Sequence, residues 1–393
     1  MTRHIVPAGK PAPHSMGDSP PRLSSLDVFR GLTMAAMVIV NNPGDWNTVY
    51  SPLLHAEWHG WTPTDLVFPF FLFILGVSMT LSRRPLSWGR IVQRSGTIAG
   101  LGWFMAGFPF FRLATWRIPG VLVRIGVCYL CAATITRIAR PASGNDCRHL
   151  VRLLATVTIL LVGYWALMTQ IDTPWAARGD LSPEGNLGAV LDRALFMGHL
   201  YHRTWDPEGL LTTVPAVAST LLGIVIGLWM RGNPGRTWSL VGTGCAATVF
   251  GLVWGRSFPI NKNLWTSSYV VFTAGFAAAM LGVLRALLDR PGDRNASTGR
   301  DALLQKLTQP FAVLGSNAIL LFVVSGLVGK LLIVIHTNGP TGEQISLQSA
   351  IYQRWFAPAA PPEIASLLYA ATNLVVLFAL LLALYRRHIF LKV

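Results

Sequence analysis

The chain has 393 residues, of which 52% are apolar and only 12% are Asp, Glu, Lys or Arg, and its mean hydropathy is +0.47. Soluble domains carry about 25% charged residues, so this composition excludes an ordinary soluble enzyme, and it also excludes a disordered chain. The net charge of +15 would suit nucleic-acid binding. The basic residues, however, lie in short clusters between long apolar runs, as in the loops of membrane proteins. We therefore expect a lipid bilayer as the partner, and no nucleic acid.

The N-terminal segment differs in composition from the rest of the chain. Residues 1–22 are rich in Pro and Gly and lack the apolar stretch of a signal peptide. We predict that they form a disordered cytoplasmic tail and that residues 23–393 form a single transmembrane domain. The Cys128-x-x-Cys131 spacing lies inside an apolar run, so these cysteines are interpreted as small core residues.

Long apolar segments dominate the remaining sequence. A bilayer core of about 30 Å requires about 20 apolar residues per helix. Ten segments meet this requirement: 26–43, 63–82, 91–109, 119–137, 150–170, 211–230, 238–255, 264–284, 309–335 and 364–385. The ninth is long enough to tilt or break near Gly326 and Gly329. The sequence therefore predicts an all-α polytopic membrane protein with about ten transmembrane helices.

The distribution of Lys and Arg predicts the orientation of these spans. Basic residues concentrate in the N-terminal tail, in alternate loops and at the C-terminus, whereas loops 44–62, 171–210 and 336–363 carry fewer. Because cytoplasmic loops of membrane proteins are enriched in Lys and Arg, both termini are predicted to be cytoplasmic. The three less basic loops are then outward.

The first outward loop contains an unusual run of His and Trp residues that includes His55, Trp58 and His59. Histidine exchanges a proton near pH 7 without a large pKa shift. His55 is therefore a candidate for catalysis, with a solvated interfacial histidine as the alternative. The loop ends in Thr62-Pro63-Thr64-Asp65, the spacing of a capping box, which predicts that Asp65 caps the second span.

Three polar side chains lie inside predicted spans, where charge is costly. Arg30 follows Asp27 at a spacing of three residues, which favours either an ion pair at the helix end or contact with an anionic ligand. Arg124 stands in an apolar run and is expected to face a partner or a wet cavity. Asn317 is interpreted as a residue that hydrogen-bonds a neighbouring helix or serves a site.

Two polar motifs precede later spans. Asp206-Pro207-Glu208-Gly209 begins the sixth span, with Asp206 predicted as its N-cap. Asn261-Lys262-Asn263 begins the eighth. No phosphate-binding loop, dinucleotide fingerprint or metal-ligand spacing occurs, so no metal is expected.

Several motifs, in one order, resemble the heparan-α-glucosaminide N-acetyltransferase family and its bacterial relatives labelled NagX-like or DUF5009. The motifs are Leu26-Asp27-Val28-Phe29-Arg30-Gly31, Val40-Asn41, His55-Ala56-x-Trp58-x-Gly60, Asp65-Leu66-Val67-Phe68-Pro69, Arg124-Ile125-x-Val127-Cys128-Tyr129-Leu130, Asp206-Pro207-Glu208-Gly209, Asn261-Lys262-Asn263-Leu264-Trp265 and Leu384-Tyr385-Arg386-Arg387-x-Ile389-Phe390. Together they cover roughly residues 22–393.

The resemblance implies acetyl transfer across a membrane. The enzyme would take acetyl from cytoplasmic acetyl-CoA and deliver it to the amino group of an amino sugar, or of a glycan that carries one, in the periplasm. The location implied is the bacterial inner membrane, and the family suggests a homodimer. The family's essential His matches His55 and its partner Asn matches Asn41. His55 would act as general base or as transient acetyl carrier, and Asn41 would orient His55 or donate to the oxyanion.

The remaining assignments divide the candidates between the two substrates. Arg30, Arg124 and Asn317 are predicted to bind acetyl-CoA, and the predicted sugar contacts are Trp58, Asp206, Glu208, Asn261, Lys262 and Asn263. Two alternatives stay open. An amino-sugar transporter would explain the spans and the loop aromatics, and an O-acetyltransferase of an envelope polysaccharide would share the mechanism with a different nucleophile.

Overall fold

The structure, a computed structural model, describes residues 23–82, 87–172, 177–289, 299–339 and 342–390; the predicted tail, residues 1–22, lies outside them. These residues are mostly helical, as expected, and they add one antiparallel ribbon of two short strands. The α-helices are α1 (Ser24–Asn41), α2 (Val67–Leu81), α3 (Trp88–Gly107), α4 (Val121–Ala139), α5 (Asp146–Gln170), α6 (Leu187–Phe196), α7 (Leu210–Gly232), α8 (Thr237–Trp254), α9 (Ser267–Leu288), α10 (Gly299–Ser316), α11 (Ala318–Val334), α12 (Leu347–Ile351) and α13 (Pro362–Arg386). The shorter elements are the 3-10 turns η1 (Ser51–Leu53), η2 (Pro63–Leu66) and η3 (Leu113–Thr115), the π-helical turn η4 (Tyr352–Phe356), and strands β1 (His336–Asn338) and β2 (Gln344–Ser346).

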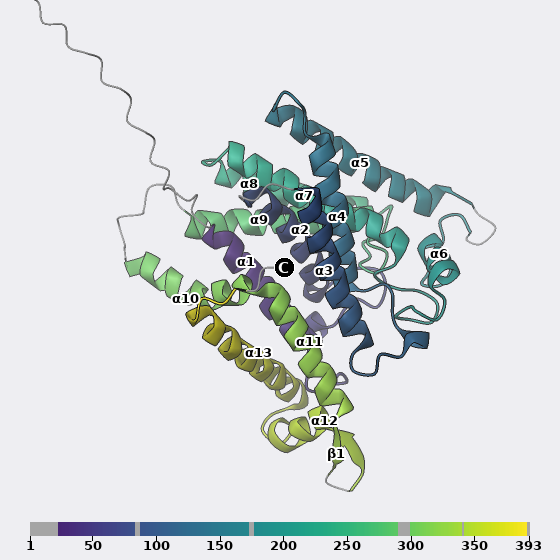
Figure 1. The fold of residues 1–393 in the computed structure, drawn as a ribbon, viewed down its shortest axis with the longest axis vertical. Coiled ribbons are helices and arrows are strands. Elements are labelled where there is room, and N and C mark those ends of the chain that lie inside the picture. Colours follow the sequence, from purple (N-terminus) through teal and green to yellow (C-terminus); the bar gives the residue numbers. More distant parts are fainter. Residues whose placement is uncertain (1–22, 83–86, 173–176, 290–298, 340–341, 391–393) are drawn as a thin grey trace, which may run out of the picture.

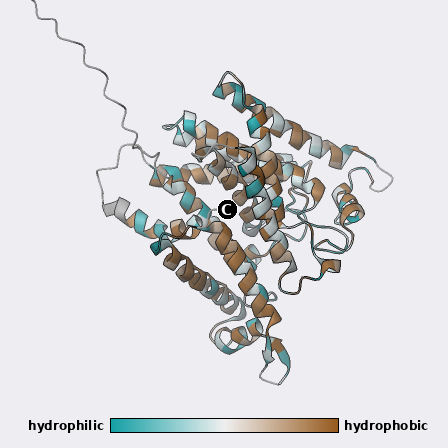
Figure 2. Ribbon diagram, in the orientation of Figure 1, coloured by the Kyte–Doolittle hydropathy of each residue, from teal (hydrophilic) through white to brown (hydrophobic). Residues whose placement is uncertain are grey.

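All ten predicted spans lie on helices, but not all are equally apolar. In the described residues, seven helices are long and apolar enough to cross a membrane, and a bent pair formed by α10 and α11 would be an eighth. The other two predicted spans, α1 and α3, carry charged residues such as Arg30 and Arg94 within the helix. Figure 2 shows that even α13, at the outside of the fold, is hydrophobic along most of its length, as expected of a polytopic membrane protein.

The ninth predicted span does break, but not where expected. The prediction of a break near Gly326 and Gly329 is wrong, because α11 runs through both residues and the 75° bend lies between Ser316 and Ala318. Asn317 leaves the helical region there, with φ −128° and ψ 46°. Its side-chain amide nitrogen donates to the carbonyl of Ile389 at 3.2 Å, so the segment after α13 lies next to the bend.

Glycine contacts set the close helix crossings. A Cβ on Gly76 of α2 would lie 2.0 Å from the carbonyl oxygen of Thr220 on α7, and one on Gly31 of α1 would lie 1.7 Å from that of Phe311 on α10. Small residues permit this approach of helix backbones in membranes. Helices α2 and α7 are consequently the most enclosed of the apolar spans, whereas α5, α8 and α13 lie outside (Figure 1).

The two ends of α1 lead to different parts of the molecule. At its beginning, the amides of Ser24 and Ser25 donate to the carboxylate of Asp289, which follows α9. At its end, Asn41 leads into the loop that carries His55. A helix of 18 residues is about 27 Å long, so this helix separates the two ends by most of a bilayer core.

Candidate active site

His55 and Asp65 form a hydrogen-bonded pair on the loop between α1 and α2. His55 Nδ1 lies 2.7 Å from Asp65 Oδ1. The Asp65 side chain is 1% exposed and the His55 side chain is 49% exposed. When the carboxylate accepts a hydrogen bond from Nδ1–H, the proton of neutral His55 is held on that nitrogen. Nε2 is then the nitrogen that can take a proton from a bound molecule.

Asp65 has this position because it also caps a helical turn. Its second oxygen accepts from the amide of Thr62 at 3.0 Å and from the amide of Ala56 at 3.1 Å. The capping box with Thr62 is present, as predicted, and the Tyr269 hydroxyl donates to the Asp65 carbonyl at 2.5 Å. The pairing with His55 was not anticipated. The signal for it was an acid that the cap buries on the same short loop as a histidine.

Lys262 brings a third charged group to this pair. Its Nζ lies 3.1 Å from each ring nitrogen of His55 and 3.8 Å from Asp65 Oδ1. Burial lowers the pKa of Lys262, although the carboxylates of Asp65 and Glu208 act against that effect. The structure thus joins His55, Asp65 and Lys262 in one cluster, which we call the His55 cluster.

The turn that carries Lys262 is held by Asn261. The Asn261 side chain accepts from the amide of Leu264 at 2.9 Å, and its amide nitrogen lies 3.3 Å from Nδ1 of His59. The amide of Gly60 also donates to the carbonyl of Ile260 at 2.7 Å. Two loops far apart in the sequence are therefore tied together at the His55 cluster. Asn263 lies half-buried in the same turn.

A second acidic group lies before α7. Arg117 donates to both carboxylate oxygens of Asp206, at 2.6 and 2.9 Å, and also to Glu208. Burial alone would lower the pKa of Arg117, but the carboxylates of Asp206 and Glu208 raise it. Among the described contacts, Asp206 also accepts from the amides of Tyr201 and Glu208. These ion pairs of Arg117 with Asp206 and Glu208 connect the segment before α4 to the segment before α7.

The predicted N-cap at Asp206 is wrong. Helix α7 begins at Leu210 with Gly209 as its N-cap, because Arg117 and nearby amides occupy the Asp206 carboxylate. The side chain of Asp192, on α6, instead accepts a hydrogen bond from the amide of Leu210, the first residue of α7, at 2.9 Å. Burial raises the pKa of Asp192 to about 6.

Arg124 lies at the base of this region, near the beginning of α4. It is 1% exposed and donates to the Thr212 hydroxyl at 2.5 Å and to the Gly209 carbonyl at 3.2 Å. Its guanidinium lies over the Trp265 ring, 5.1 Å from the centroid. Within the described residues, its Nε and Nη1 have no hydrogen-bond partner. Arg124 thus lies next to the segment that carries Asp206 and Glu208.

Aromatic side chains border the His55 cluster. Trp58 donates from Nε1 to the Leu181 carbonyl at 2.8 Å, and its ring meets Trp205 edge-on at 5.1 Å. Trp205 stacks on His202 at 4.2 Å, and the neighbouring Tyr201 is 63% exposed. Sequence reasoning singled out Trp58 but missed Trp205, whose only signal was an aromatic run just before Asp206.

Arg30 and Asn317 lie elsewhere. Arg30 donates to Asp27 at 3.1 Å, to Ser78 Oγ at 2.7 Å and to the Gly315 carbonyl at 3.3 Å. It lies in the second turn of α1, toward the end opposite to the His55 loop. Asn317 lies beside it, two residues after Gly315. The structure does not bring these two residues to the His55 cluster.

Asn41 and Asn42 end α1 with different surroundings. Asn41 is exposed, and no hydrogen bond to His55 is found in the part of the chain that the structure describes. Asn42 donates to the Val38 carbonyl at 2.8 Å and to Ser325 Oγ of α11 at 3.1 Å. The orientation of His55 therefore comes from Asp65.

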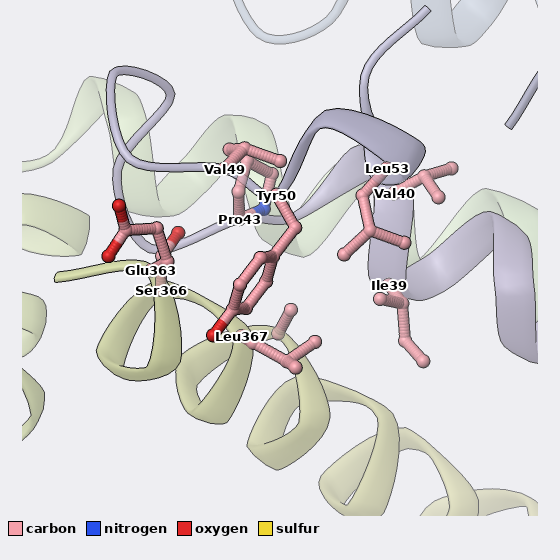
Figure 3. A pocket seen from close by; sticks show the side chains of 10 residues that line it. Ile39, Val40, Pro43, Val49, Tyr50, Leu53, Glu363, Ser366 and Leu367 are labelled. Atoms are coloured by element: carbon pink, nitrogen blue, oxygen red, sulfur yellow. The ribbon is translucent and has the colours of Figure 1, made fainter. Parts of the chain in front are cut away.

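Two hollows lie away from this cluster. One, between the end of α1 and the beginning of α13, is bordered by Val40, Pro43, Tyr50 and Glu363 and holds about 10 Å³ (Figure 3), room for one water molecule at most. The other measures about 760 Å³ and is lined by uncharged side chains of α2, α5, α7, α8 and α9 and by Ser257. The first is too small for a substrate, and the second has no acidic or basic side chain in its lining. Among the described residues, no three His, Cys, Asp or Glu side chains gather to hold a metal ion.

Comparisons with known proteins identify the family of the chain. The family model described as heparan-alpha-glucosaminide N-acetyltransferase, catalytic, matches residues 22–260. The chain belongs to this family. The matched range contains His55, Asp65 and Glu208, and it ends next to Asn261.

Two relatives within the family are the human and mouse heparan-alpha-glucosaminide N-acetyltransferases. The human protein is 30% identical over 374 residues, which cover 80% of this chain and 54% of that protein. The mouse protein is 30% identical over 371 residues, which cover 79% of this chain and 54% of that protein. The chain thus spans about half the length of these relatives.

Proposed function

We propose that the chain is a membrane acetyltransferase that moves acetyl from acetyl-CoA to the amino group of an amino sugar. The observation that carries the proposal is the contact of 2.7 Å between His55 Nδ1 and the buried carboxylate of Asp65. Membership of the N-acetyltransferase family supports the reaction class. The acceptor would approach from the outward side, a proposal that rests on the charges of the loops.

His55 would act as the general base. A thioester is already reactive, so the barrier lies in positioning and in removing the proton of the attacking amine. Asp65 keeps the proton of neutral His55 on Nδ1, and Nε2 takes the proton of the amine as the new C–N bond forms. The C–S bond breaks and the CoA thiolate leaves, then receives the proton from His55. An acetyl group carried on Nε2 is the alternative course.

The other candidate residues are proposed to bind the two substrates, the amino sugar and acetyl-CoA, at different places in the molecule. Trp58 and its aromatic neighbours offer faces and edges for a sugar ring, and Glu208 offers a carboxylate for its polar groups. Asp206 and Asn261 hold the segments around them, and Asn263, in the same turn as Lys262, remains a candidate contact for the sugar. Arg30 and Asn317, at the predicted cytoplasmic end, would meet the nucleotide part of acetyl-CoA. Arg124 lies closer to the acetyl end.

The test is acetyl transfer by purified protein in liposomes with labelled acetyl-CoA and glucosamine. His55→Ala should abolish transfer, and Asp65→Asn should lower kcat by at least about 10²-fold. The exposed histidine of β1 provides a matched control, because His336→Ala removes an imidazole far from the cluster in the sequence. Transfer by a folded His55→Ala protein at the wild-type rate would contradict the role of His55, and the absence of transfer by the wild-type protein would contradict the proposed function.

The same preparation distinguishes the alternatives. Acid quenching during turnover would trap label on the wild-type protein, and not on His55→Ala, if His55 carries the acetyl group. Hydroxyl acceptors that outperform glucosamine would indicate O-acetylation. Glucosamine uptake that does not require acetyl-CoA, without transfer, would indicate a transporter.

A further inference from the structure

The ammonium group of Lys262 is placed against the ring of His55. Its Nζ is 3.1 Å from both Nδ1 and Nε2. An ammonium in the ring plane at equal distances from both nitrogens would collide with the carbon between them, so it lies over the ring. A lysine ammonium has three N–H donors. None of them is aligned with a ring lone pair, so they can serve a bound molecule.

The backbone under Lys262 is fixed. Its carbonyl accepts from the Trp265 amide at 3.1 Å, and the neighbouring Asn261, 0% exposed, holds the turn through the Leu264 amide. Trp265 adopts φ 51°, a left-handed conformation that a large residue keeps only when its surroundings enforce it. The backbone that carries the ammonium is therefore fixed before a substrate arrives, which favours electrostatic stabilisation of a transition state.

The charges around Lys262 keep it near the pair. Asp65 Oδ1 is 3.8 Å from Nζ, and Glu208 also attracts it, whereas the cation Arg124 repels it. The titratable neighbours in the two joined loops are His55 and His59. Two carboxylates, Asp65 and Glu208, thus attract Lys262, and the exposed imidazole of His55 lies against its ammonium group. A developing negative charge beside His55 would find its nearest cation here.

We infer that Lys262 stabilises the negative charge that develops on the acetyl oxygen during the transfer, an inference that rests on the proposed function. The amine nitrogen attacks the carbonyl carbon, and the π electron pair moves onto the oxygen beside Nζ. When the pair returns, the C–S bond breaks and CoA leaves as thiolate. The amine proton passes to His55 Nε2 and then to the thiolate. The products are the N-acetylated sugar and CoA thiol.

This assignment gives Lys262 the contact with the oxyanion, one of the two roles that the family resemblance predicts for Asn41. Asn41 is exposed at the end of α1 and makes no described hydrogen bond with His55. Arg124 is also a poor candidate, because it is buried beneath Trp265 and donates to Thr212 and Gly209. Lys262 is the cation whose distance to His55 suits the reaction.

The first test compares two substitutions at this position. Lys262→Met should lower kcat by about 10²-fold or more, with a much smaller change in KM for the amine. Lys262→Arg keeps the charge and should restore part of kcat. Lys306→Met, which removes an exposed lysine of α10, is the control and should match wild type. A folded Lys262→Met protein with wild-type kcat would overturn the inference.

The second test is the pH dependence of kcat, which a merely structural lysine would not affect. Burial lowers the pKa of Lys262, so the charged form is present at low pH and is lost as pH rises through that pKa. Wild-type kcat should therefore fall on the alkaline side. Arginine stays charged throughout this range, so Lys262→Arg should remove the fall. An identical alkaline fall in both proteins would contradict the role.

His55→Ala, measured in parallel, distinguishes this inference from the proposed function. If His55→Ala is inactive and Lys262→Met is fully active, the reaction stands and the role of Lys262 fails. If both retain wild-type transfer, the roles of His55 and Lys262 fail together; if the wild-type protein itself transfers no acetyl, the proposed function fails. Thermal unfolding of each variant verifies that it is folded.

Discussion

Asn41 and Asn42 are neighbouring residues of the same type with different surroundings. Asn41, which the resemblance predicts to be the partner of His55, is exposed at the end of α1. The amide of Asn42 instead bridges α1 to Ser325 of α11, at 3.1 Å. One side chain is available to a substrate, and the other is part of the packing between helices.

Replacing each asparagine with Ala should therefore change different quantities. Asn41→Ala should lower kcat at least about tenfold, the effect of losing a substrate contact, with an unchanged unfolding temperature. Asn42→Ala should lower the unfolding free energy by about 1 kcal/mol, because it removes a hydrogen bond between helices. Acetyl-transfer kinetics and thermal unfolding in detergent measure both effects. The interpretation fails if Asn41→Ala destabilises the protein and leaves kcat unchanged.

The sequence identifies single residues of the site better than their contacts. The spacing of Thr62 and Asp65 predicts a cap because capping is a local interaction. Lys262, by contrast, meets His55 across 207 positions, and no local pattern encodes that contact. At Asp206 a local pattern gives a wrong prediction. Its position predicts an N-cap, but Arg117, which is distant in the sequence, donates hydrogen bonds to its carboxylate.

At the level of elements, the length of the apolar segments predicts the long helices well. The short elements in polar segments are not predicted. The spans appear as helices because a bilayer core demands them. The short helix α6 and the ribbon of β1 and β2 lie in loops without long apolar runs, so only the structure reveals them. The side chain of Asn317, at the bend, donates to the Ile389 carbonyl, a partner that again is distant in the sequence.

Glycine crossings provide a test of the packing. A Cβ on Gly31 would lie 1.7 Å from the Phe311 carbonyl oxygen, whereas one on Gly96 of α3 meets nothing within 4 Å. Gly31→Ala must push α1 and α10 apart and should cost about 1–3 kcal/mol of unfolding free energy. Gly96→Ala should cost nothing, since Ala favours helix. Equal unfolding temperatures for the two variants would show that α1 and α10 do not cross at Gly31.

At the scale of the whole molecule, the two candidate groups occupy separate ends. Arg30 and Asn317 lie at one end of the bundle, where Ser24 meets Asp289. The His55 cluster lies beyond the other end of α1. A donor that enters at the first end and an acceptor that binds at the second would use this separation, provided that the ends face opposite sides of the membrane.

Cysteine labelling tests that orientation. Cys147 is exposed near the beginning of α5, on the side predicted to be cytoplasmic, and Asn47 is exposed on the loop that carries His55. A membrane-impermeant maleimide should label Asn47→Cys in intact cells, and Cys147 only after lysis. Cys131 and Cys245 are changed to Ser in both proteins, Cys147 is also changed to Ser in the Asn47→Cys protein, and Cys128 is buried.

The reverse labelling pattern would have a definite consequence for the mechanism. It would place His55 on the same side as acetyl-CoA, so the acetyl group would not need to cross the membrane. Arg30 and Asn317 would then face away from the donor, and their proposed contacts with CoA would be untenable. The chemistry of His55, Asp65 and Lys262 would stand unchanged, because it depends on distances within one cluster and not on the side of the membrane that the cluster faces.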